Sequence, residues 1–178
     1  MPVQIGAKAH SFSQPTGLLS DCHRRIEMFV GSLERLSRLV DKQLEDDARA
    51  ALDSALRYFR EAAPKHTADE EESLFPRLRQ LQHPDVQAAI GALEPLEKEH
   101  RRADFLHAEV NELGKRCLAQ GSLSKSEADR FRHAVTELAS IYKEHIRIED
   151  EVVFPAAGWA LSDTDKVAIA KEMASRRA

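Results

Sequence analysis

Cysteine, glycine and proline are scarce in this sequence, and each scarcity excludes a class of protein. The 178 residues include two cysteines, Cys22 and Cys117, with seven glycines and seven prolines. Two cysteines are too few for the disulfide framework of a small secreted protein, and the low glycine and proline content argues against an all-β fold. No apolar run approaches the ~18–20 residues that cross a bilayer, and residues 1–17 lack the apolar core of a signal peptide. We therefore expect a cytoplasmic protein with no membrane partner.

The charge balance is mildly acidic. Lys and Arg number 26 against 30 for Asp and Glu, a net charge of −4, so a nucleic-acid partner is not expected. Hydrophobic residues make up 42% and charged residues 31% of the chain, a globular composition sufficient for one domain with a substantial core.

Apolar residues recur at helical spacing along four segments between residues 18 and 157. Each stripe is the one-sided pattern of a helix that faces a shared core. The sequence predicts an all-α fold: an up-down-up-down antiparallel four-helix bundle over residues 18–157, after an irregular lead-in over residues 1–17. A linker and a short helix over residues 158–178 follow, and Pro64 predicts a kink in the second helix.

Three breaks separate the four predicted helices. They lie at residues 44–47, 83–85 and 121–124, and in the last of them Ser124 and Glu127 have the spacing of a capping box. Short connections of this kind favour antiparallel neighbours.

Four histidines lie on the apolar stripes, one in each predicted helix: His23, His66, His100 and His145. In an antiparallel pair, two residues at one level are equally far from the turn. The midpoints of successive histidines are 44.5, 83 and 122.5, and each falls in one of the three breaks. The four histidines are therefore predicted to share one layer of the bundle.

The sequence also repeats itself around these histidines. His66 and His145 are each followed by a glutamate at offset 4, two more acidic residues, and Phe-Pro at offsets 9 and 10. His23 and His100 are each followed by two arginines. An offset of 77 residues relates His23 to His100, and an offset of 79 relates His66 to His145. Each half of the repeat is therefore a helical hairpin.

Two glutamates complete the predicted site. Residues i and i+4 are neighbours on a helix, so Glu70 projects beside His66 and Glu149 beside His145. Buried ionised carboxylates are very costly without compensating charge, and four imidazoles with two carboxylates suit two metal ions bridged by the carboxylates. Iron is the first choice, with manganese and zinc behind it. The predicted ligands are His23, His66, Glu70, His100, His145 and Glu149.

Three other residues are weaker ligand candidates. Asp104 follows His100 by four residues but is better read as an outer hydrogen-bond acceptor. His107 lies on the stripe of His100 one layer on, where a hydrogen-bonded core histidine is the favoured interpretation. Asp150 follows His145 by five residues, which points it off the axis of a regular helix, although a π-bulge could bring it in.

Two other interpretations of the cluster are weaker. A purely structural core would leave the two carboxylates uncompensated. A ferritin-like site needs two Glu-x-x-His motifs, and Glu97 with His100 provides one alone.

This set of motifs resembles the hemerythrin-like HHE cation-binding family. The resemblance covers roughly residues 18–157 and includes the two Phe-Pro signatures and Glu99-His100. It implies a four-helix bundle that holds a non-haem di-iron centre with bridging carboxylates and an oxo or hydroxo bridge. Under this resemblance the four histidines are terminal ligands, while Glu70 and Glu149 bridge the two ions.

The sequence departs from the oxygen-carrying members of that family. Those carriers have a fifth histidine four residues from another on the third helix, where this chain has Leu96 and Asp104. The set of four histidines and two glutamates is more like that of members that act in iron–sulfur repair or respond to nitric oxide.

We therefore expect a metal-binding protein that reacts with a small ligand: oxygen, nitric oxide or hydrogen peroxide. The alternative is a non-catalytic sensor of oxygen, redox state or iron, or an iron store, and the sequence leaves open whether the protein is an enzyme. It contains no signal for the oligomeric state.

Overall fold

The computed structural model describes residue 10 and residues 14–178, and these residues contain helices and no strand. In chain order the helices are α1 (Pro15–Ser37), α2 (Asp46–Glu61), α3 (Ala63–Ala68), the π-helix η1 (Asp69–Leu74), α4 (Phe75–Leu78), the 3-10 helix η2 (Pro84–Val86), α5 (Gln87–Gln120), α6 (Lys125–Ile148), the π-helix η3 (Glu149–Val153), α7 (Phe154–Ala160) and α8 (Asp163–Ser175).

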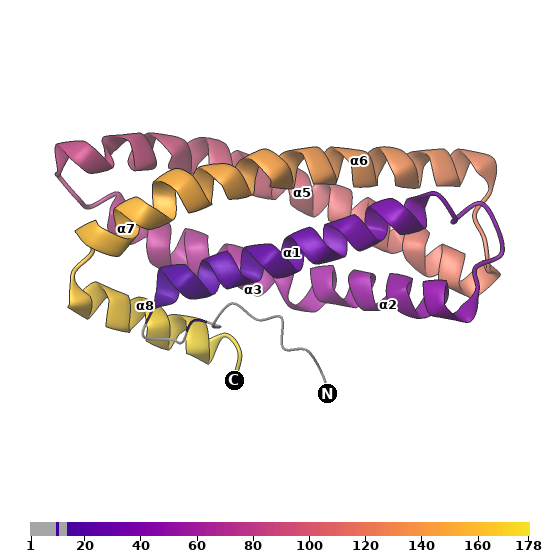
Figure 1. Ribbon diagram of the computed structural model, residues 1–178, viewed down its shortest axis with the longest axis horizontal. Coiled ribbons are helices and arrows are strands. Elements are labelled where there is room, and N and C mark those ends of the chain that lie inside the picture. Colours follow the sequence, from indigo (N-terminus) through magenta and orange to yellow (C-terminus); the bar gives the residue numbers. More distant parts are fainter. Residues whose placement is uncertain (1–9, 11–13) are drawn as a thin grey trace, which may run out of the picture.

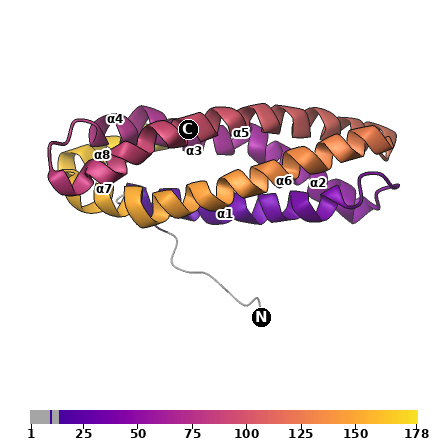
Figure 2. The same ribbon diagram turned by 90° about the horizontal axis from the view of Figure 1, so that it is seen from above.

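These helices form four long rods that run along one axis (Figures 1 and 2). The first rod is α1, the second is α2 continued by α3, η1 and α4, the third is α5, and the fourth is α6 continued by η3 and α7. The rods close a ring, because α1 and α5 each contact both α2 and α6. The predicted all-α class is confirmed. In the described part of the chain, no helix is both long enough and apolar enough to cross a membrane.

The second and fourth rods are more broken than the sequence predicted. Ala62 interrupts the second rod, and Pro64 stands in the first turn of α3, where its missing N–H costs nothing. The prediction of a kink within one helix was therefore wrong. In the fourth rod α7 continues through Gly158 to Ala160, so the predicted linker is largely helical.

The helix α8 packs against the side of the bundle near one end, where it contacts η1 and α1 (Figure 1). Ser162 caps its N-terminus, because the hydroxyl of Ser162 accepts a hydrogen bond from the backbone N–H of Asp165 at 3.1 Å. The capping box of Ser124 and Glu127 at the start of α6 is also confirmed.

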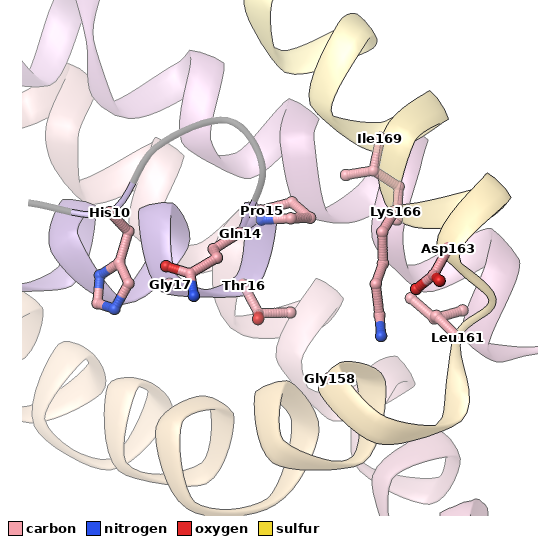
Figure 3. A pocket seen from close by; sticks show the side chains of 10 residues that line it. All are labelled: His10, Gln14, Pro15, Thr16, Gly17, Gly158, Leu161, Asp163, Lys166 and Ile169. Atoms are coloured by element: carbon pink, nitrogen blue, oxygen red, sulfur yellow. The ribbon is translucent and has the colours of Figure 1, made fainter.

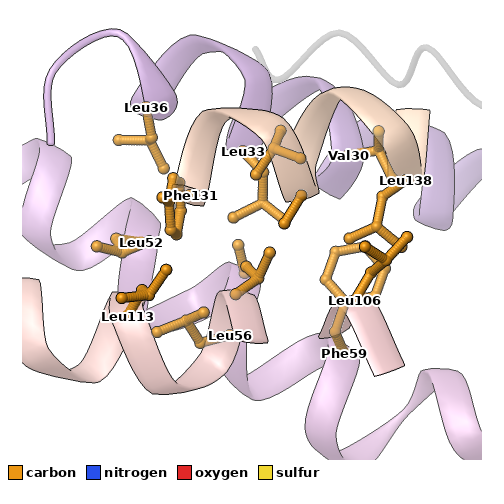
Figure 4. Close-up of a cluster of buried hydrophobic side chains, with 14 of the residues drawn as sticks. Val30, Leu33, Leu36, Leu52, Leu56, Phe59, Leu106, Leu113, Phe131 and Leu138 are labelled. Atoms are coloured by element: carbon orange, nitrogen blue, oxygen red, sulfur yellow. The ribbon is translucent and has the colours of Figure 1, made fainter. Parts of the chain in front are cut away.

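Buried apolar side chains form two main clusters. The first fills the end of the bundle near the α1–α2 and α5–α6 connections and includes Leu33, Leu113 and Phe131 (Figure 4). The second includes Leu74 and Phe75 and fills the end covered by α8. The four predicted histidines lie between the clusters, so apolar side chains seal their layer on both sides.

The turn between α5 and α6 depends on Gly121, which has a φ of +89°. Its carbonyl accepts a hydrogen bond from the N–H of Leu44 at 3.1 Å, which ties this turn to the one between α1 and α2. A Cβ atom at Gly121 would lie 2.5 Å from the amide oxygen of Gln43.

Replacing this glycine should destabilise the fold. We expect Gly121→Ala to lower the free energy of unfolding by about 1–2 kcal/mol, the cost of a left-handed conformation with a Cβ atom. The matched control is Gly91→Ala in α5, where a Cβ meets no atom within 4 Å and helix propensity should add about 0.5–1 kcal/mol. Urea denaturation of the metal-free protein measures both. Equal effects of the two substitutions would contradict this assignment.

Candidate metal centre

Six buried side chains from all four rods meet in the layer between the two apolar clusters. They are His23 of α1, His66 of α3, Glu70 of η1, His100 of α5, His145 of α6 and Glu149 of η3. These are the six residues that the sequence analysis selected as ligands.

The two carboxylates lie at the centre of this cluster. The Nε2 atoms of His66 and His100 lie 3.0 Å and 3.3 Å from oxygens of Glu70. Those of His23 and His145 lie 3.0 Å and 3.2 Å from Glu149. Two overlapping groups result, and in each the candidate ligand atoms lie within 4.8 Å of one another. One group contains His23 and His66, the other His100 and His145, and both contain the two glutamates.

These atoms approach one another without forming hydrogen bonds. Within the described residues, Nε2 of His23 and all four oxygens of Glu70 and Glu149 have no hydrogen-bond partner. Buried polar atoms without partners are expensive, and both glutamates are completely buried. The donor set therefore fits cations, which would satisfy the carboxylate oxygens and the imidazole nitrogens together.

Each bridging candidate lies in a π-helix. Glu70 belongs to η1 and Glu149 begins η3, and π-helical turns are frequent at functional sites. Pro76 and Pro155 follow these segments closely, and each lacks the N–H that would bond to the carbonyl four residues earlier. The repeated Phe-Pro pair thus explains why the second and fourth rods each contain a π-helix, at Glu70 and at Glu149.

Three of the four histidines also contact a carboxylate through Nδ1. The pairs are His23 with Asp150 at 3.1 Å, His100 with Glu71 at 2.7 Å and His145 with Glu99 at 2.9 Å. Such partners orient an imidazole so that its other nitrogen faces a metal. Asp150, a weaker ligand candidate, occupies this outer position and is in neither group.

Two phenylalanine rings stack on histidine rings of this centre. Phe154 stacks on His23 with ring centroids 5.1 Å apart, and Phe75 stacks on His100 at 6.4 Å. The sequence patterns had indicated no structural role for these phenylalanines, for Glu71 or for Glu99. Their positions beside the repeated ligands were the available signal.

Asp104 and His107 do not join the cluster either. Asp104 is exposed. His107 shares a 2.9 Å hydrogen bond between its Nε2 and the hydroxyl of Tyr142, and burial lowers its pKa to about 4. His107 is thus neutral and hydrogen-bonded, which agrees with the favoured interpretation.

Two cavities differ in their position relative to this centre. A cavity of about 10 Å³ adjoins the four histidines and Tyr142, which is room for about one water-sized molecule. A larger cavity of about 420 Å³ lies between the start of α1, α7 and α8 (Figure 3). Its lining, where described, contains none of the six residues.

Comparison with known proteins decides the family. The sequence-family model of the hemerythrin HHE cation-binding domain matches residues 14–157. The chain belongs to this hemerythrin family. It is also similar to an uncharacterized protein of Haemophilus influenzae, with 29% identity over 168 residues that cover 94% of this chain and 92% of the relative. The similarity to the hemerythrin-like HHE family expected from the motifs is confirmed, and a cation-binding domain agrees with the donor set above.

Without cations, protons balance the two carboxylates of this hemerythrin domain. Burial lowers the pKa of His66 and His100, but the negative charge of Glu70, 3.0 Å and 3.3 Å from their Nε2 atoms, outweighs burial and raises each pKa to about 9. Burial likewise opposes ionisation of Glu70, but the charge of His66 holds its pKa well below the usual range.

The metal-free protein should therefore lose stability in alkali. A histidine whose pKa rises from 6.5 to about 9 on folding stabilises the fold fully below pH 6.5, and this contribution disappears as the pH passes 9. We expect the free energy of unfolding of the metal-free protein to fall between pH 6.5 and 9, and bound cations to suppress the fall because they replace the protons. Urea denaturation of both forms tests this. A metal-free protein that is equally stable at the two pH values would contradict it.

Proposed function

We propose that this chain binds two iron ions, one with His23 and His66 and the other with His100 and His145, and that Glu70 and Glu149 bridge them. The observation that carries the proposal is that both glutamates belong to both groups of candidate ligands while their oxygens lack hydrogen-bond partners. A mixed nitrogen and oxygen donor set suits iron, with manganese and zinc as the alternatives. We also propose that residues 18–157 form the metal-binding unit, with residues 158–178 as an addition to it.

We propose further that the centre reacts with oxygen, nitric oxide or hydrogen peroxide. Two ferrous ions held by these residues would supply the two electrons that oxygen or peroxide takes up, and they would bind nitric oxide. The protein limits what reaches them, because the adjoining cavity of about 10 Å³ excludes larger molecules. Tyr142 lines that cavity, and its hydroxyl shares a hydrogen bond with neutral His107. Burial raises the pKa of Tyr142, so this part of the cavity wall is a hydroxyl that keeps its proton.

A non-catalytic sensor is the second candidate, and one contact favours it. Asp69, next to Glu70, is completely buried and pairs with Arg176 at 3.0 Å and Arg177 at 2.5 Å. Both arginines directly follow α8, which ends at Ser175. A change at Glu70 would therefore act directly on the C-terminal helix. Turnover of peroxide or nitric oxide favours the enzyme, and reversible binding without turnover favours the sensor.

Loss of one bridging carboxylate should remove metal. We expect Glu70→Ala and Glu149→Ala to fall from about two irons per chain to one or fewer, because each glutamate serves both groups of ligands. The controls are His83→Ala and His133→Ala, whose side chains are 54% and 80% exposed, and both should keep the full content. Elemental analysis of the folded variants measures this. Metal loss from a control with retention in both glutamate variants would refute the ligand assignment.

The symmetry of the proposed ligands predicts the reaction with oxygen. Each ion receives two histidines and the two shared carboxylates, and neither gains a third histidine because Leu96 and Asp104 occupy the carriers' positions. We expect oxygen to oxidise the reduced protein without a long-lived reversible adduct, and azide or nitric oxide to perturb its spectrum. Stopped-flow mixing with oxygen tests this. A stable adduct that releases oxygen under vacuum would identify a carrier.

A further inference from the structure

A second cavity, of about 300 Å³, opens at the outer edge of His66. It lies between α1, the junction of α2 and α3, and the C-terminal end of the chain, and Glu70 is not among the described residues that line it. Its lining includes Cys22, Arg25, Tyr58, Lys65, His66 and Arg177.

His66 is the exception among the four histidines of the centre. The other three each contact a carboxylate through Nδ1, whereas Nδ1 of His66 has no hydrogen-bond partner among the described residues although the side chain is only 6% exposed. When Nε2 of a histidine binds a metal, Nδ1 carries the proton and requires an acceptor. The neighbouring group at His66 is the thiol of Cys22, which is a weak acceptor, so a strong acceptor is missing at this edge of the centre.

The internal repeat identifies where that acceptor would stand. The offset of 77 residues that relates His23 to His100 also relates Cys22 to Glu99. Glu99 is the carboxylate that contacts Nδ1 of His145, and His145 is the repeat counterpart of His66. The second half of the chain thus supplies a carboxylate where the first half has a thiol, which is a weak acceptor.

The lining of the cavity is cationic. Arg25 and Lys65 form no ion pair within the part of the chain that the structure describes, and Arg25 Nη2 lies 3.2 Å from the sulfur of Cys22. Arg177 also lines the cavity but is engaged by Asp69. Among the described residues of the lining, Glu61 is the one carboxylate, and it pairs with Arg60 at 2.9 Å. Two positive charges therefore face the cavity without a carboxylate of their own.

We propose that this cavity binds a small oxyanion, a phosphate or a carboxylate, that accepts a hydrogen bond from Nδ1 of His66 and pairs with Arg25 and Lys65. The anion supplies from solution the acceptor that Glu99 supplies in the other half. This inference rests on the proposed metal-binding role of His66. Outer partners of this kind change metal affinity by about tenfold or more, so the anion should tighten metal binding.

Inorganic phosphate is the probe. Isothermal titration of the metal-loaded protein in low-chloride buffer should show one phosphate per chain. The double variant Arg25→Gln/Lys65→Gln should bind it at least about tenfold more weakly, because it loses two charge-assisted contacts. The matched control is Arg102→Gln. Arg102 is the repeat counterpart of Arg25 but pairs with Glu137, so its variant should bind phosphate unchanged.

The variant Cys22→Glu distinguishes phosphate binding at this site from nonspecific attraction of anions to the positive side chains. A carboxylate at position 22 should fill the role of Glu99, abolish phosphate binding and retain tight metal binding without phosphate, whereas Cys22→Ala should still bind phosphate. Chelator competition with and without phosphate measures the metal affinity. No phosphate binding by the parent protein, or equal binding by the double variant, would overturn the proposal.

The same titration on metal-free protein distinguishes the two proposals. Phosphate binding that depends on Arg25 and Lys65 in a protein that takes up no metal would refute the proposed function and leave the anion site standing. Metal binding that is unaffected by phosphate would refute the anion site alone.

Discussion

Two ionised carboxylates buried at the middle of the bundle, Glu70 and Glu149, are the constraint on which the rest of the structure depends. Both are completely buried and their oxygens lack hydrogen-bond partners within the described chain. Neither could stay charged there unless positive charge lay beside it. Protonated histidines provide that charge, as the raised pKa values of His23, His66 and His100 reflect, or the four histidines provide the nitrogen atoms that hold cations in place of the protons.

The two halves of the repeat depend on each other around this centre. Each half provides the ring and the carboxylate that hold a histidine of the other half: Phe154 and Asp150 hold His23, while Phe75 and Glu71 hold His100. In a single hairpin, His23 or His100 would therefore lack its stacked ring and its carboxylate. The repeat fails at Cys22, which replaces a carboxylate, and at Asp69, which pairs with two arginines at the C-terminal end.

The sequence predicted the parts of this architecture that have a local period or a local motif. Stripes at helical spacing predicted the rods, turn chemistry predicted the three breaks, and the i, i+4 spacing placed Glu70 beside His66. The outer role of Asp150 was missed because it depends on the exact phase of a π-helix relative to α1. The contacts of Arg176 and Arg177 with Asp69 join residues more than 100 positions apart, and no local pattern encodes such ion pairs.

The most direct test of the central claim is metal analysis of the purified protein together with its near-ultraviolet spectrum before and after anaerobic reduction. We expect about two irons per chain and a charge-transfer absorption of a bridged ferric pair that disappears on reduction. One tightly held zinc per chain, with no such absorption, would contradict it.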